Sequence, residues 1–205
     1  MDSQTFWSAL EWFGVLTGLL YLWFEIKQKA AMWVVGIMCS VSYIFVYASA
    51  RLYADMAFYI YSSSMSVYGF VLWRRRIGGA TAQIQYRRLG TRLSLTLAAL
   101  TAVAYAAISL MLSLFTDSPV PFFDAFTTAL SITATWMLAK RYIAHWWWWV
   151  AVDGASVALY CIRGLYPTML LFAFYTVSAV GGYFFWKRRG EPAASVQNTE
   201  PTITE

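Results

Sequence analysis

Three side chains in the sequence combine aromatic stacking surface with a negative charge. Trp146, Trp149 and Asp153 follow the spacing i, i+3 and i+7, which places them on one face of a helix. Two indole rings and a carboxylate on one stripe could hold a flat, positively charged aromatic ligand by stacking and by charge. The alternative is that the run from Trp146 to Trp149 marks a membrane interface, with Asp153 bonded to a neighbouring hydroxyl. We favour the ligand-binding stripe.

Polar side chains also recur inside other apolar segments. An ionisable group at membrane depth is costly unless it faces a cavity or a partner. The helix faces that carry them, grouped by segment, are Trp33, Gly36 and Ser40; Tyr59, Ser62, Ser63 and Ser66; and Asp124, Thr127, Ser131 and Thr135. A single hydroxyl often only bonds to its own helix or permits close packing, but together these faces indicate a lined pathway. The expected substrate-binding residues are Trp146, Trp149, Asp153, Trp33, Ser40, Tyr59, Ser63, Ser66 and Asp124.

Enzymatic chemistry finds little support in the sequence. The pattern G-x-x-x-x-G-K-[ST] of nucleotide-hydrolysing proteins does not occur. The single histidine, His145, is expected beside basic residues at the cytoplasmic interface, and no second ligand accompanies it to form a metal site. Asp153 and Asp124 as an acid–base pair would lack a nucleophile. We therefore expect no enzyme, no cofactor and no metal.

The segments that carry these residues are hydrophobic enough to cross a membrane. Of the 205 residues, 60% are hydrophobic and only 12% are charged, whereas soluble domains carry roughly 25% charged residues. A membrane helix needs about 20 apolar residues, and seven segments qualify. They are residues 6–26, 32–48, 54–73, 93–115, 121–139, 146–162 and 166–186. The sequence predicts an all-α membrane protein.

Basic residues predict the orientation of these spans. With the N-terminus outside, 13 of the 15 Lys and Arg residues fall on the cytoplasmic side, and only Arg51 and Arg163 lie outside. We expect a multi-pass membrane protein, N-terminus out and C-terminus in, with no cleaved signal peptide. The net charge of +5 then reflects topology, and a nucleic-acid partner is not expected. Cys39 and Cys161 are expected to be free thiols.

The sequence matches itself without gaps when it is shifted by 113 residues. The matched pairs include Trp23 with Trp136, Trp33 with Trp146, Ser40 with Asp153, Tyr47 with Tyr160, and Trp73 with Trp186. Aromatic-rich composition could produce some of these matches by chance, but one register over three helices favours duplication. The expected divisions are a first three-helix repeat (6–76), a basic cytoplasmic loop with a linker helix (77–120), a second repeat (121–189) and a disordered cytoplasmic tail (190–205). Parallel repeats of this kind are a transporter architecture.

Several separated motifs occur together in the chain. They are the run from Glu11 to Trp23, the segments Leu52-Tyr53-Ala54-Asp55-Met56 and Ser66-Val67-Tyr68-Gly69, and the stretch from Trp146 to Asp153 followed by Gly164-Leu165-Tyr166. In this order they resemble the PnuC-like vitamin transporters, over nearly the whole chain except the tail. The resemblance implies a sugar-facilitator-like 3+1+3 architecture, a homotrimer, and alternating-access uniport of a small vitamin across the bacterial inner membrane. It also implies a functional link to a cytoplasmic kinase that traps the substrate by phosphorylation.

Two departures from the family pattern bear on the substrate. The sixth-span motif of the riboside transporters is Trp-x3-Trp-x2-Trp-x3-Asn, where this chain has Tyr142, Trp146, Trp149 and Asp153. Many relatives also carry Gln where this chain has Tyr59. An ionised Asp only accepts hydrogen bonds, whereas Asn also donates. Nicotinamide riboside is the first expectation, thiamine is a close alternative, and a vitamin-binding subunit of a larger importer is a third.

Overall fold

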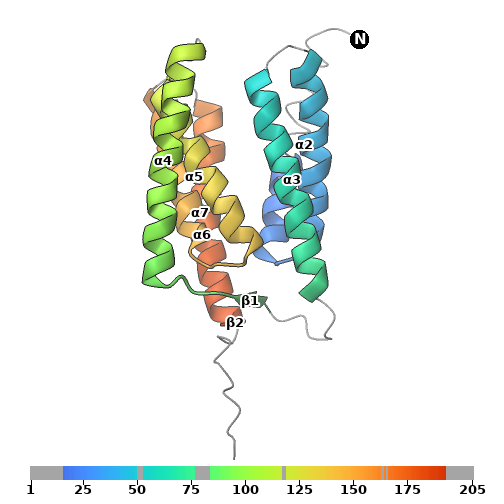
Figure 1. Ribbon diagram of the computed structural model, residues 1–205. Coiled ribbons are helices and arrows are strands. Elements are labelled where there is room, and N and C mark those ends of the chain that lie inside the picture. The colour runs from blue at the N-terminus through green and yellow to red at the C-terminus, as the bar shows by residue number, and fades with distance from the viewer. Residues whose placement is uncertain are drawn as a thin grey trace, which may run out of the picture.

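The computed structural model describes residues 16–49, 53–76, 84–116, 119–162, 164 and 166–192. This part of the chain forms seven helices and two strands of three residues each (Figure 1). The helices are a first helix Leu16–Ile26, α2 Ala31–Ser49, α3 Tyr53–Arg76, α4 Thr91–Phe115, α5 Pro121–Ala139, α6 His145–Ile162 and α7 Tyr166–Arg189. The strands are β1 Ile84–Tyr86 and β2 Gly190–Pro192.

The all-helical prediction is confirmed, and the predicted spans agree with the described helices to within a few residues. Residues 6–15 of the first predicted span lie outside the described residues. Within the described chain, α4, α5 and residues Met169–Arg189 of α7 are long and apolar enough to cross a membrane. Local signals fix the ends, because Pro121 begins α5 and the last turn of α7 carries three basic residues that suit a helix C-terminus.

The helices stand side by side in two groups (Figure 1). The first helix, α2 and α3 lie on one side, and α4 to α7 lie on the other. α2 packs along α3, α6 along α7, and α4 along α5, while α3 and α5 make contact between the groups. Many large apolar side chains of α4 are exposed, including Leu95, Val103 and Leu114, as expected for a helix that faces lipid.

Two tryptophan pairs with the same geometry fix α2 against α3 and α6 against α7. The rings of Trp33 and Trp73 meet edge to face at 5.6 Å and 90°, and those of Trp146 and Trp186 at 5.6 Å and 88°. Within each pair the α2 or α6 ring also lies directly on a glycine of the partner helix, Gly69 or Gly182. Edge-to-face contact over a residue without a side chain brings the helices close together.

The second indole of each pair also ties the two groups together. Trp73 Nε1 donates a hydrogen bond of 3.0 Å to the carbonyl oxygen of Ala139, at the end of α5. Trp186 Nε1 donates one of 3.0 Å to the carbonyl oxygen of Ile26, at the end of the first helix. The last carbonyls of a helix have no partner within it, so each indole supplies a donor to a carbonyl that its own helix leaves unbonded.

The corners after the first helix and after α5 have the same backbone path. Gln28 and Arg141, 113 residues apart, have φ angles of 53° and 61°. The Gln28 N–H donates to the Glu25 carbonyl at 3.0 Å, and the Arg141 N–H donates to the Leu138 carbonyl at 2.9 Å. Both corners therefore end a helix with one left-handed residue, the usual device for reversing the chain.

A short extended segment, residues 84–87, lies across both corners. β1 pairs in parallel with β2, and Gln85 exchanges two hydrogen bonds with the Gln28 side chain at 2.7 and 3.0 Å. Arg87 donates to the Arg141 carbonyl at 2.8 Å and accepts from the Ile143 N–H at 3.0 Å. Neither strand was predicted, and β2 occupies the start of the segment expected to be a disordered tail; residues 193–205 lie outside the described residues.

The glycine contact under Trp146 can be tested against a neighbouring glycine. A Cβ at Gly182 would lie 2.5 Å from the Trp146 ring, whereas a Cβ at Gly181 would meet nothing within 4 Å. We expect Gly182→Ala to destabilise the fold by about 1–3 kcal/mol through overpacking. Thermal unfolding of the purified protein in detergent, followed by tryptophan fluorescence, measures the loss. Gly181→Ala is the control, and an equal shift in both variants would contradict the interlocked packing.

Candidate substrate-binding site

A cavity of about 440 Å³ lies between α2 and α3 on one side and α5 on the other. We call it the hydroxyl chamber. Its lining includes Gly36, Cys39 and Ser40 of α2 and Tyr59, Ser62 and Ser66 of α3. None of its described lining residues carries a charge. It can therefore offer hydrogen bonds and aromatic surface to a ligand, but no ion pair.

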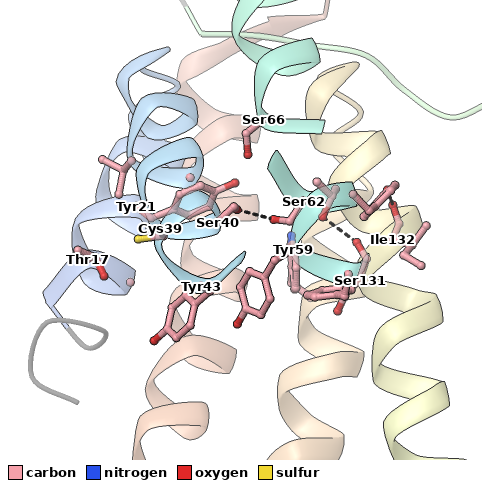
Figure 2. A pocket seen from close by; sticks show the side chains of 17 residues that line it. Thr17, Tyr21, Cys39, Ser40, Tyr43, Tyr59, Ser62, Ser66, Ser131 and Ile132 are labelled. Carbon is pink, nitrogen blue, oxygen red and sulfur yellow. Dashed lines mark hydrogen bonds between the residues drawn. The ribbon is translucent and has the colours of Figure 1, made fainter. Parts of the chain in front are cut away.

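The polar groups of the hydroxyl chamber are ordered by contacts among themselves (Figure 2). The Ser40 hydroxyl donates to the Ser62 hydroxyl at 3.1 Å, joining α2 to α3. Tyr43 and Tyr59 stack with ring centroids 4.9 Å apart and planes 26° from parallel. The Tyr61 hydroxyl donates to the Ile132 carbonyl of α5 at 3.1 Å. This chamber is thus bordered by hydroxyls whose positions are set by three different helices.

A second cavity of about 340 Å³ lies between α6, α7 and the first helix. We call it the acidic chamber. Trp146, Trp149 and Asp153 of α6 line it, together with Tyr175 of α7 and Glu25 of the first helix. Asp153 is only 8% exposed and Glu25 only 4%. Two carboxyl groups therefore face one largely apolar space, and no Lys or Arg is among its described lining residues.

The two chambers are lined at corresponding positions. Seven residues of the hydroxyl chamber have a counterpart in the acidic chamber exactly 113 positions later. The pairs are Gly18 and Ser131, Gly36 and Trp149, Cys39 and Val152, Ser40 and Asp153, Tyr59 and Phe172, Ser62 and Tyr175, and Ser66 and Ala179. Gly18, Tyr21, Ser131 and Trp149 line both chambers, so the cavities adjoin at these residues.

The structure brings together six of the nine residues expected to bind substrate. The three members of the predicted stripe line the acidic chamber, and Ser40, Tyr59 and Ser66 line the hydroxyl chamber. The indole N–H of Trp149, at the boundary between the chambers, is buried with no hydrogen-bond partner among the described residues, so it is placed to donate to a ligand.

Three expected residues line neither chamber. Trp33 is fully buried against Trp73 and Gly69, where its ring packs two helices together. Ser63 is replaced in the hydroxyl chamber by its neighbour Ser62, since the two point in different directions from α3. Asp124 lies in the first turn of α5, where its carbonyl accepts a hydrogen bond from the Thr127 hydroxyl.

The sequence reasoning missed an ionisable pair beside the acidic chamber. His145 Nε2 lies 3.3 Å from Glu25 Oε1, and His145 is fully buried. A signal for this pair exists in the sequence. The residues 113 positions away from Glu25 and His145 are Leu138 and Met32, which are both apolar. A charged residue matched by an apolar one indicates that the two positions have different surroundings in the fold, and both of these positions meet that condition.

Comparisons with known proteins place this architecture in a family. The model of the nicotinamide mononucleotide transporter family matches residues 8–188. The chain is 22% identical over 216 residues to the nicotinamide riboside transporter PnuC of Escherichia coli K12, covering 92% of this chain and 90% of that protein. It is 25% identical over 185 residues to the PnuC of Neisseria mucosa, covering 84% of this chain and 70% of that protein.

A solved structure has the same fold. The crystal structure of the vitamin B3 transporter PnuC matches with a TM-score of 0.67 at 24% sequence identity. The match covers 85% of this chain and 78% of that chain. The family match includes both chambers and all seven described helices. The chain belongs to the nicotinamide mononucleotide transporter family, as its resemblance to PnuC-like proteins predicted, and is a multi-pass membrane transporter, not an enzyme.

Proposed function

We propose that the chain is a facilitator that equilibrates a small cationic vitamin, nicotinamide riboside, across the membrane. The observation that carries this proposal is Asp153, a buried carboxylate in a chamber walled by Trp146 and Trp149. The nicotinamide ring of the riboside is flat and permanently positive, so it suits indole faces and a carboxylate. Its ribose suits the adjoining hydroxyl chamber. The curated relatives are named for the same substrate.

The chemistry of the two chambers predicts how binding energy is divided. A cation about 4 Å from a carboxylate gains roughly 4 kcal/mol at an effective dielectric constant near 20, before desolvation is counted. A neutral hydroxyl contributes about 0.5–1.5 kcal/mol net for each hydrogen bond. The acidic chamber should therefore supply most of the affinity, and the hydroxyl chamber should orient the sugar.

We further propose the 3+1+3 arrangement, with 6–76 and 121–189 as parallel repeats and 77–120 as the basic loop with its linker helix. The matched corners, the matched tryptophan pairs and the matched chamber linings support it. In such carriers, alternating access is rocking of one repeat against the other around a fixed site. The two chambers meet at Gly18 and Ser131, where that site would lie.

The remaining expectations rest on charge and on family resemblance. We propose that the N-terminus faces outward and the C-terminus faces the cytoplasm, because 13 of 15 basic residues then lie inside. A uniporter gives net uptake only while free substrate is removed inside the cell, and phosphorylation by a cytoplasmic kinase would remove it. A homotrimer would bury part of the exposed apolar surface of each chain. A reporter fused to the C-terminus tests the orientation, and the mass of the purified particle tests the trimer.

Thiamine is the competing substrate. Asp153 stands where the riboside motif has Asn, and an acid at this position favours any permanently cationic ring. Uptake of labelled nicotinamide riboside and labelled thiamine into liposomes that contain only this protein separates the two. Uptake of neither compound would overturn the facilitator, and uptake only with an added ATPase would indicate a binding subunit of an importer.

Removing the carboxylate should cost more than removing the matched hydroxyl. We expect Asp153→Ala to weaken binding of nicotinamide riboside by roughly 10- to 100-fold, because a charged partner is lost. Ser40→Ala, the counterpart position in the hydroxyl chamber, should change affinity by less than about threefold. Calorimetric titration of the purified protein measures both. Equal effects of the two substitutions would count against the acidic chamber as the cation site.

An uncharged ligand of the same shape provides the matched control. The dihydro form of nicotinamide riboside keeps the sugar and the ring but loses the positive charge. Its affinity should be much weaker for the unmodified protein and nearly insensitive to Asp153→Ala. If Asp153→Ala weakened both ligands equally, its effect would come from altered packing and not from lost charge.

Cys39 allows occupancy of the hydroxyl chamber to be followed directly. Cys39 lines this chamber, whereas Cys161, the other cysteine, is exposed at the far end of α6. In a Cys161→Ser chain, a small methanethiosulfonate reagent should label Cys39, and saturating substrate should slow labelling severalfold by filling the space. A chain without cysteines corrects for background. Labelling at the same rate with saturating substrate would exclude the hydroxyl chamber from the bound site.

A further inference from the structure

Glu25 and His145 form a buried contact between the two groups of helices. Glu25 lies in the last turn of the first helix, and His145 is the first residue of α6. Nε2 of His145 is 3.3 Å from Oε1 of Glu25, and the two residues are 0% and 4% exposed. The imidazole is enclosed by the rings of Trp146 and Trp186, at centroid distances of 4.6 and 5.0 Å.

The second ring nitrogen determines where the protons of this pair are. Nδ1 of His145 lies 2.6 Å from the Tyr142 carbonyl oxygen. A carbonyl oxygen only accepts hydrogen bonds, so Nδ1 carries a proton. Nε2 of a neutral imidazole would then present a lone pair to a carboxylate oxygen, which is repulsive. The contact is favourable only when one further proton is held on Nε2 or on the Glu25 carboxyl group.

The pair is not required by the two corners that it joins. The counterparts of Glu25 and His145 are Leu138 and Met32, which lie at the opposite corners and are also buried. The two corners have the same backbone hydrogen bonds, and each has one left-handed residue. The same local structure is therefore built with two apolar side chains, so the costly burial of a carboxylate and an imidazole calls for another explanation.

The other charged and titratable groups nearby leave the acidic chamber without a cation of its own. Asp153 of α6, Tyr175 of α7 and Tyr21 of the first helix line it together with Glu25. Two basic residues of the corners, Lys27 and Arg141, lie over aromatic rings that do not line this chamber. The Lys27 ammonium lies 4.9 Å from the Phe185 centroid, and the Arg141 guanidinium lies 4.8 Å from that of Trp73.

We propose that the Glu25–His145 pair is a proton-binding site that exchanges its proton for a cation in the acidic chamber. This inference rests on the proposed function, because it takes the ligand to be a monocation. With its shared proton the pair is neutral, and when the proton leaves to the solvent the pair is a carboxylate beside a neutral imidazole. Glu25 lines the chamber while His145 lies behind it. A cation next to Glu25 stabilises the deprotonated pair, so one positive charge enters as one leaves.

The exchange fixes the sign of the pH dependence. Because deprotonation and cation binding favour each other, affinity for a monocation rises with pH through the range in which the pair titrates. Complete release of one proton gives a slope of about tenfold in affinity per pH unit. An uncharged ligand in the same chamber gains nothing from deprotonation, so its affinity does not follow this slope.

Calorimetry can count the proton. Nicotinamide riboside and the smaller flat cation 1-methylnicotinamide are titrated into the full-length protein at one pH, in buffers of different ionisation enthalpy. The observed heat should vary linearly with buffer enthalpy and report release of up to about one proton per bound cation. The dihydro riboside should release none. Cation binding to the unmodified protein without proton release would overturn the proposal.

Two isosteric substitutions test each partner. Glu25→Gln removes the acid, so proton release should disappear and cation affinity should fall about tenfold. His145→Gln leaves a donor for the Glu25 carboxylate but no titrating ring, so the cation should still bind while proton release is lost. Persistence of full proton release in both variants would place the titrating group elsewhere and overturn the assignment.

A ligand-free measurement separates this inference from the proposed function. If neither cation binds, the proposed function fails, and the proton site is judged by potentiometric titration of the protein alone. The titration curves of the unmodified protein and of Glu25→Gln should then differ by about one bound proton. Identical titration curves would overturn the proton site whatever the substrate.

Discussion

Reciprocal hydrogen bonds from two indoles to two helix-ending carbonyls hold the two groups of helices together. Trp73 reaches the end of α5, and Trp186 reaches the end of the first helix. Each bond satisfies a carbonyl that its own helix cannot use, and each indole is fixed by its edge-to-face partner. Both chambers depend on this arrangement, because each is lined by helices of both groups.

On this common frame the two chambers differ mainly in side-chain chemistry. Ser40 and Asp153 stand at matched positions, as do Gly36 and Trp149. One exchange adds a carboxylate and the other adds an indole, and both fall in the acidic chamber. The helices of the two halves pack in the same way, but the side chains that line the two chambers differ. One half can therefore bind charge while the other binds hydroxyls.

Much of this molecule could be predicted from sequence, for reasons that differ between its parts. Helix bounds follow from apolar length and from punctuation such as Pro121, and they were correct to within a few residues. The stripe ending in Asp153 follows from helical spacing alone. Trp33 illustrates the limit, because the same spacing serves packing when a glycine, Gly69, faces the ring. The Glu25–His145 contact could not be derived, since it joins residues 120 positions apart across an interface.

The segment at residues 84–87 has a mechanical consequence. It is hydrogen-bonded to Gln28 at one corner and to Arg141 and Ile143 at the other. Because this segment is bonded to both corners, it keeps the distance between them nearly constant for as long as those hydrogen bonds persist. A rotation of one group of helices relative to the other that keeps these bonds must have its axis close to residues 84–87. The displacement of each helix is then largest at the end farthest from the corners.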